Sequence, residues 1–160
     1  MDKVLLDGFA IGIGATLFMD LVALFLKQSL SIQPLNYSLV GRLFVHLLQG
    51  RVRHNPITAS PARSYESLIG WTLHYLIGVV FVLIFLSFVG DEWLITPRLG
   101  PALAFGALTV IVPFLILQPG MGAGLAARLT PRPSIARLKS LLAHLSFGAG
   151  IWVSAICFQL

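Results

Sequence analysis

The sequence predicts an all-α membrane protein with four transmembrane helices and one amphipathic helix at the membrane surface, in a single domain over residues 1–160. Hydrophobic residues make up 57% of the chain and charged residues 11%, a balance outside that of soluble globular proteins. The lysines and arginines lie outside four long apolar runs, where anionic lipid headgroups account for the net charge of +5. The sequence lacks the basic and aromatic interleaving of a nucleic-acid-binding module, so we expect no nucleic acid as a partner.

Each of the four apolar runs is long enough to cross the hydrocarbon core, for which about 20 helical residues suffice. The runs cover residues 4–26, 67–90, 99–127 and 140–160. The first is followed by no convincing signal-peptide cleavage site, and we expect it to be a retained helix. The third contains Pro113 and Pro119, so we expect it to cross the membrane while kinked or tilted.

The distribution of basic residues predicts the orientation of the chain. The loops after the first and the third apolar run hold most of them: Lys27, Arg42, Arg51, Arg53 and Arg63 in the one, and Arg128, Arg132, Arg137 and Lys139 in the other. Between the second and third runs the sequence has only Arg98. Because short basic loops stay in the cytoplasm, we expect a multi-pass protein of the bacterial inner membrane with both termini outside the cytoplasm.

Residues 35–49, in the first cytoplasmic loop, predict an amphipathic interfacial helix. Leucines form one stripe of this helix and polar side chains form the opposite one: Leu35, Leu39, Leu43 and Leu47 against Ser38, Arg42, His46 and Gln49. Two roles are open for the helix. It rests among the lipid headgroups, or it acts as a lid that brings Arg42 or His46 over the bundle.

Two sequence features, His54 and a glycine pattern at residues 120–124, are interpreted as structural and not as parts of a functional site. His54, beside Arg53, is interpreted as a solvated loop histidine, with a ligand role as the alternative. Gly120, Gly122 and Gly124 form a Gly-x-Gly-x-Gly pattern, but no strand precedes it, as a dinucleotide site would require. This pattern therefore predicts close helix packing or a helix break.

Asp20, His74 and His144 lie inside three of the apolar runs, where an ionisable side chain is a functional-site hypothesis. Small residues flank each of them at four-residue spacing, which lets helix backbones approach closely and predicts that all three side chains point into the bundle. At ~1.5 Å of rise per residue, each lies about 8–12 Å from the predicted cytoplasmic boundary. We therefore expect one shared polar layer. Its expected neighbours are Gln118, Tyr75 and Trp71.

The chemistry of this layer leaves several functions open. An Asp and His relay near the aqueous face is typical of transport-type proteins that bind or relay a small ligand, ion or proton, and this is our leading hypothesis. In a non-catalytic accessory subunit, with a second copy or another membrane protein as partner, the layer would only fix helix packing. Asp20, His74 and His144 also suit a transition metal, and two histidines suit the axial positions of a haem.

Enzymatic activity finds little support in the sequence, although the question stays open. A Gly-x-Ser-x-Gly elbow is missing. The single cysteine, Cys157, has no histidine at a common depth with which to form a nucleophilic pair.

Several segments together point to a family. They are the run Gly-Ile-Gly-Ala-Thr-Leu-Phe-Met-Asp that ends at Asp20, Leu-Asn-Tyr at 35–37, Val-Gly-Arg at 40–42, Gly70, Trp71, His74 and Tyr75, residues 118–124, and the basic stretch before His144. In these segments the chain resembles the domain of unknown function 2938 family over almost its whole length. The resemblance implies a four-helix architecture in the bacterial inner membrane, and it implies no substrate and no catalytic residues.

Overall fold

The computed structural model describes residues 2–158, apart from the side chain of Asp2, and every regular element in that range is a helix. Four helices are long and apolar enough to cross a membrane, and a shorter apolar helix follows the first of them. The four are Lys3–Leu30, Glu66–Val89, Leu99–Gly120 and Pro133–Cys157, and the shorter one is Tyr37–Leu48. This confirms the predicted fold class, an all-α protein with four potential membrane spans and one additional helix.

Two helix ends differ from the predicted span boundaries by more than a few residues. The third span ends at Gly120, not at residue 127, because Gly122 and Gly124 adopt φ angles of +89° and +74° that an α-helix cannot contain. The glycine pattern is thus a helix break, one of its two predicted roles. The helix that contains the fourth predicted span begins at Pro133, before residue 140, since proline suits the first turn of a helix, where its missing N–H has no partner to lose.

The third span is irregular where its prolines lie. Helix α5 (Leu99–Thr109) is followed by a π-helical stretch, η2 (Pro113–Leu117), and by the short α6 (Gln118–Gly120). Pro113 has no N–H for the helical ladder, and the backbone N–H of Gln118 bonds to the carbonyl of Pro113. The prolines therefore interrupt regular α-helical bonding, as the sequence predicted.

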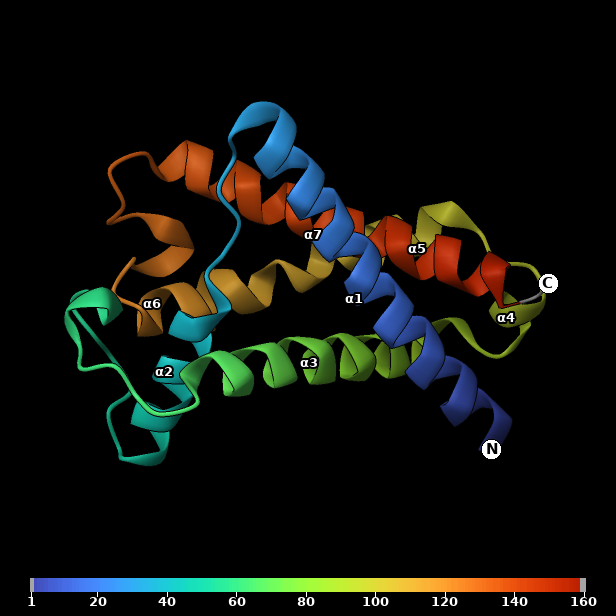
Figure 1. Ribbon diagram of the computed structural model, residues 1–160. Coiled ribbons are helices and arrows are strands. Elements are labelled where there is room, and N and C mark those ends of the chain that lie inside the picture. Colours follow the sequence, from blue (N-terminus) through green and yellow to red (C-terminus); the bar gives the residue numbers. More distant parts are fainter. Residues whose placement is uncertain (1, 159–160) are drawn as a thin grey trace. The chain divides into compact units, whose positions relative to one another are not determined.

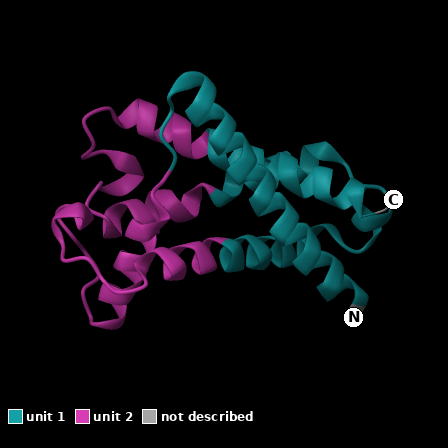
Figure 2. Ribbon diagram, viewed as in Figure 1, with its two compact units in different colours: residues 1–34, 75–109, 142–160 teal, residues 35–74, 110–141 magenta. Residues whose placement is uncertain are grey.

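The chain divides into two compact units, coloured in Figure 2. Unit 1 consists of residues 1–34, 75–109 and 142–160, and unit 2 consists of residues 35–74 and 110–141. Helices α3 (Glu66–Val89) and α7 (Pro133–Cys157) each contribute their first turns to unit 2 and their later turns to unit 1.

Unit 1 packs α1 (Asp2–Leu30), α5 and the later turns of α3 and α7, labelled in Figure 1, through glycines. A Cβ added to Gly12 would lie 2.6 Å from Cα of Val79, and one added to Gly106 would lie 2.7 Å from Cα of Gly148. Backbones thus approach closely, as the spacing of small residues predicted. The buried apolar core of the unit is Ile11, Ala15, Val82, Phe85, Leu86, Trp93, Ala102, Phe147, Ile151 and Ala155. Trp93 belongs to the short α4 (Glu92–Ile95).

Unit 2 packs α2 (Tyr37–Leu48) against the first turns of α3. A Cβ added to Gly41 would overlap the backbone of α3, and one added to Gly70 would overlap the carbonyl of Tyr37. Asn36 caps α2 by accepting a hydrogen bond from the backbone of Ser38 at 3.0 Å.

The loop between α2 and α3 also belongs to unit 2. It contains the 3₁₀ turn η1 (Ile57–Ala59), and a second 3₁₀ turn, η3 (Leu125–Ala127), follows α6. The backbone N–H groups of His54 and Ile57 donate to the carbonyls of Gly120 and Met121, each at 3.0 Å. These two bonds fix the loop against the end of α6.

Candidate functional site

Asp20 and Tyr75 form a polar pair within unit 1. The phenol of Tyr75 donates to Oδ2 of Asp20 at 3.0 Å, and both side chains are half-buried. Asp20 lies one helical turn after Thr16, which is fully buried and whose hydroxyl donates back to Gly12. The structure therefore brings Asp20 together with Tyr75, one of the neighbours expected for it.

His144, also in unit 1, bonds to Thr109. The hydroxyl of Thr109 donates to the carbonyl of Gly106 at 2.6 Å, and its oxygen lies 2.8 Å from Nδ1 of His144. The hydroxyl has only one hydrogen, and it is donated to the Gly106 carbonyl. Nδ1 must therefore be the donor to the Thr109 oxygen. The ring of His144 is thus oriented by a buried threonine that sequence reasoning did not select.

His74 lies in an aromatic cluster of unit 2. Its ring stacks on Tyr37 with centroids 4.0 Å apart and 25° between planes, and it meets Trp71 edge-on at 5.8 Å. Tyr37 and Trp71 also contact each other, at 4.6 Å. Trp71 was an expected neighbour of His74, whereas Tyr37 was missed. The available signal for it was the Leu-Asn-Tyr segment of the family resemblance.

Gln118 bonds within unit 2 to the hydroxyl of Ser140 at 3.1 Å, while its Oε1 is buried without a hydrogen-bond partner in the described part of the chain.

Convergence of Asp20, His74 and His144 on one level stays a prediction. Among residues 3–158, no group of three or more His, Cys, Asp or Glu side chains is arranged to hold a metal ion. The hypothesis of a metal or haem site is therefore supported only by the side-chain types of Asp20, His74 and His144, which are suitable ligands.

The most extensive polar cluster of unit 2 joins α2 to the start of α3. Nε and Nη2 of Arg42 donate to the two carboxylate oxygens of Glu66 at 2.8 and 2.7 Å, and Nη1 donates to the carbonyl of Ser60 at 3.0 Å. The two side chains are 13% and 15% exposed. Hydrogen bonding to Glu66 raises the pKa of Arg42 above its ordinary value, so the guanidinium stays charged.

His46 and Arg63 extend this cluster. His46 is completely buried, its Nε2 lying 3.4 Å from both the carbonyl of Pro61 and Nε of Arg63, and Arg63 also donates to Gln49 at 2.9 Å. The polar stripe of α2 therefore packs against the following loop, while Leu47 on the opposite stripe is 46% exposed. This arrangement suits a segment that presents Leu35 and Leu47 to lipid, and the lid role of Arg42 and His46 stays a prediction.

The interpretation of His54 as a solvated histidine was wrong. His54 is 7% exposed, its Nδ1 lies 3.2 Å from the carbonyl of Gly120, and its ring meets that of His46 edge-on with centroids 5.0 Å apart. The cause is the backbone pairing of this loop with the end of α6, a contact across more than sixty residues. Local sequence around His54 carries no signal for such pairing.

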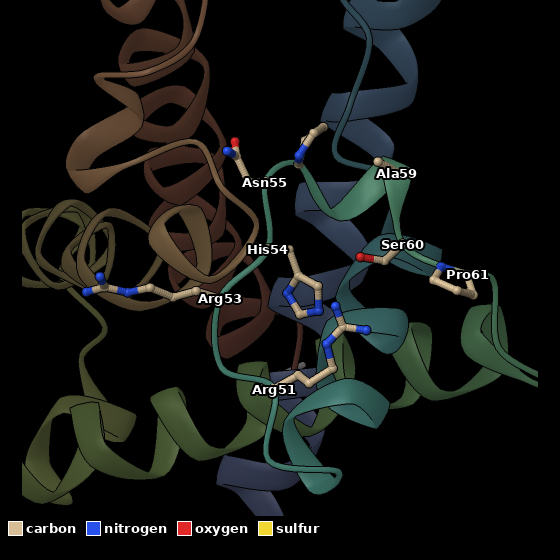
Figure 3. Close-up of a pocket in the computed structure, with 8 residues that line it drawn as sticks. Arg51, Arg53, His54, Asn55, Ala59, Ser60 and Pro61 are labelled. Carbon is tan, nitrogen blue, oxygen red and sulfur yellow. The ribbon is translucent and has the colours of Figure 1, made fainter.

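A pocket of about 470 Å³ opens beside His54 within unit 2, shown in Figure 3. Its wall is formed by Arg51, Arg53, His54, Asn55, Pro56, Ala59, Ser60 and Pro61. Two guanidinium groups and no carboxylate belong to these residues, so the pocket carries positive charge. Sequence reasoning missed it, although the Arg-x-Arg-His segment at 51–54 was a visible concentration of basic side chains.

The family model described as "Protein of unknown function (DUF2938)" matches residues 9–158. The chain belongs to the DUF2938 family. This confirms the family resemblance found in the sequence, and the match includes every polar cluster described above. The chain matches no curated protein and no solved structure. Membership of the DUF2938 family brings no activity with it, so function must be argued from the side chains.

Proposed function

We propose that this DUF2938 protein is a transport-type protein of the bacterial inner membrane that binds or relays a small ligand, ion or proton. The observation that supports this most directly is the hydrogen bond from Tyr75 to Asp20, both in helices long and apolar enough to cross a membrane. An ionisable group at such depth is costly to keep and is therefore expected to serve a function. The carboxylate of Asp20 can accept a proton or a cation while Tyr75 orients it.

Two further imidazoles extend the proposed relay. Nδ1 of His144 is oriented by Thr109, and the ring of His74 is held between Tyr37 and Trp71. Histidine is the side chain whose ordinary pKa permits protonation and deprotonation near neutral pH, which is what a proton relay needs. Gln118 is proposed as a polar neighbour because its Oε1 is buried with no partner in residues 3–158.

We expect Asp20→Asn to lower proton or ion flux in proteoliposomes by about a hundredfold or more, the contribution of one positioned acid–base group. The measurement is the decay of an imposed pH gradient, followed with a pH-sensitive dye inside the vesicles. Asp7→Asn is the matched control, since it removes another carboxylate from the same helix and should leave flux unchanged. Equal flux from wild type and Asp20→Asn would contradict the relay.

A structural or accessory role is the second candidate, because the polar groups form defined hydrogen bonds with Tyr75, Thr109 and Ser140. In this case Asp20→Asn would change thermal stability but not flux, and another membrane protein or a second copy would co-purify in mild detergent. Metal or haem binding through Asp20, His74 and His144 would give stoichiometric metal by elemental analysis or a Soret band.

The orientation has its own test. The basic loops support cytoplasmic positions for residues 27–66 and 121–139, with both termini on the opposite side. We expect alkaline phosphatase fused after residue 160 to be active and green fluorescent protein fused there to be dark. The phosphatase folds into an active form outside the cytoplasm, and the fluorescent protein becomes fluorescent inside it. A fluorescent, phosphatase-negative C-terminus would contradict the proposed orientation.

A further inference from the structure

The pocket beside His54 combines charge with an unsatisfied buried atom (Figure 3). Arg51 is exposed, and its guanidinium has no ion-pair or hydrogen-bond partner among the side chains that the structure describes. In Figure 3 this guanidinium and the hydroxyl of Ser60 are directed toward the His54 ring, whereas the side chain of Arg53 extends away from it. A free cation and a hydroxyl therefore share one space with the imidazole.

The protonation pattern of His54 follows from its neighbour. The carbonyl of Gly120 can only accept, so Nδ1 of His54, 3.2 Å away, must carry the hydrogen. This leaves Nε2 buried, and no partner for it lies within the described range. Leaving a buried polar atom unpaired is unfavourable, and such atoms in native proteins often mark a site for water, an ion or a ligand.

We propose that this pocket binds a phosphate group through Arg51, His54 and Ser60. Guanidinium groups pair with phosphate oxygens through charge-assisted hydrogen bonds, and the Ser60 hydroxyl can donate a further bond. A phosphate that retains one P–OH also has a donor for Nε2. The volume of about 470 Å³ is within the range of small-molecule sites. This site is separate from Asp20 and does not depend on the proposed relay.

The phosphate can belong to a free anion or to a lipid headgroup. Both share the chemistry that Arg51, His54 and Ser60 recognise. The nearby Leu48 and Val52 are exposed apolar side chains, which fits a pocket close to lipid. The experiment therefore needs one arm for each source.

In the first arm, inorganic phosphate is titrated calorimetrically into the full-length protein in a neutral detergent. In the second, native mass spectrometry counts lipids retained after extraction from nanodiscs of phosphatidylcholine with or without phosphatidic acid. We expect saturable binding in at least one arm. Arg51→Gln should weaken it by tenfold or more, about the effect of one charge-assisted hydrogen bond.

Two arginine variants separate a site from general charge attraction. Arg128→Gln and Arg132→Gln remove the same charge from exposed positions of unit 2 that do not line the pocket, and we expect each to change affinity by less than about threefold. His54→Gln should weaken binding as Arg51→Gln does. Because Arg51 is exposed, its replacement should leave the thermal midpoint unchanged, so the test survives if His54→Gln fails to fold.

Each outcome decides the proposal. Binding of inorganic phosphate that depends on Arg51 supports a free-anion site, and Arg51-dependent retention of phosphatidic acid alone supports a lipid headgroup site. Lack of binding in both arms would overturn the proposal. So would an equal loss of affinity in the Arg51, Arg128 and Arg132 variants, since that pattern indicates surface charge without a site. Loss of flux in Asp20→Asn has no bearing on these readings.

Discussion

Gly41→Val should largely abolish the packing of α2 against the first turns of α3. The space for a side chain at Gly41 is occupied by the carbonyl of Glu66 and the backbone N–H of Gly70, and backbone atoms in a helix cannot move aside as a flexible side chain does. Overpacking a well-filled contact costs about 1–3 kcal/mol and more when the obstacle is rigid, so we expect a loss of about 3 kcal/mol or more. Equilibrium unfolding of the purified protein in mixed micelles measures it.

Gly100→Val is the matched control for this experiment. Gly100 lies at the start of α5, is exposed, and has no atom within 4 Å of an added Cβ. Glycine and valine have similar, low helix propensities, so the free energy of unfolding should change by less than about 0.5 kcal/mol. If both variants are destabilised equally, the loss at Gly41 would come from helix propensity or membrane insertion, and the proposed close contact of α2 with α3 would be wrong.

The spans could be predicted because their signal is local. Apolar length and the absence of charge identify a membrane helix within a window of about 20 residues, and the small residues beside Asp20 mark the face on which backbones meet. The ends of the spans were harder to predict. At residues 121–127 the composition stays apolar, and the helix ends because Gly122, Gly124, Ala126 and Ala127 adopt positive φ angles.

The site could be predicted only in pieces. Tyr75 was expected as a neighbour of the polar layer that contains Asp20, but the sequence did not predict the hydrogen bond between the two side chains. His54 could not be placed in this way, because its burial depends on backbone bonds from the loop to Gly120 and Met121, far along the chain. Long-range pairing of this kind has no periodicity in the sequence.

The polar stripe of α2 shows a different limit of sequence reasoning. Amphipathicity predicted the helix and its two faces, but not which face meets protein. The ion pair of Arg42 with Glu66 resolves this, since it requires the polar stripe to face the start of α3, while Leu35 and Leu47 are exposed and Leu39 and Leu43 are half-buried. On a membrane surface the usual rule of apolar residues inside can reverse, because lipid accepts leucine as readily as a protein core does.

Arg42→Met should destabilise the protein by about 2–3 kcal/mol, below the cost of breaking a fully buried ion pair because both partners keep some exposure. The change removes both bonds to Glu66 and the bond to the Ser60 carbonyl, and it leaves a carboxylate with one backbone donor, Arg63. Arg42→Lys should recover less than half of the loss, since an ammonium cannot reproduce the planar fork that contacts two acceptors. Arg128→Met, at an exposed position, should change stability by less than about 0.5 kcal/mol.

A double-mutant cycle with Glu66→Gln isolates the pair from the rest of the cluster. Arg42 and Glu66 are both charged at neutral pH, where the cycle measures a charge-assisted interaction. We expect the sum of the stability losses in the two single variants to exceed the loss in the double variant, with a coupling energy of about 1–2 kcal/mol. Strictly additive losses, or full stability of Arg42→Lys, would mean that the bidentate contact does not hold α2 to α3, and the inward orientation of the polar stripe would then need another cause.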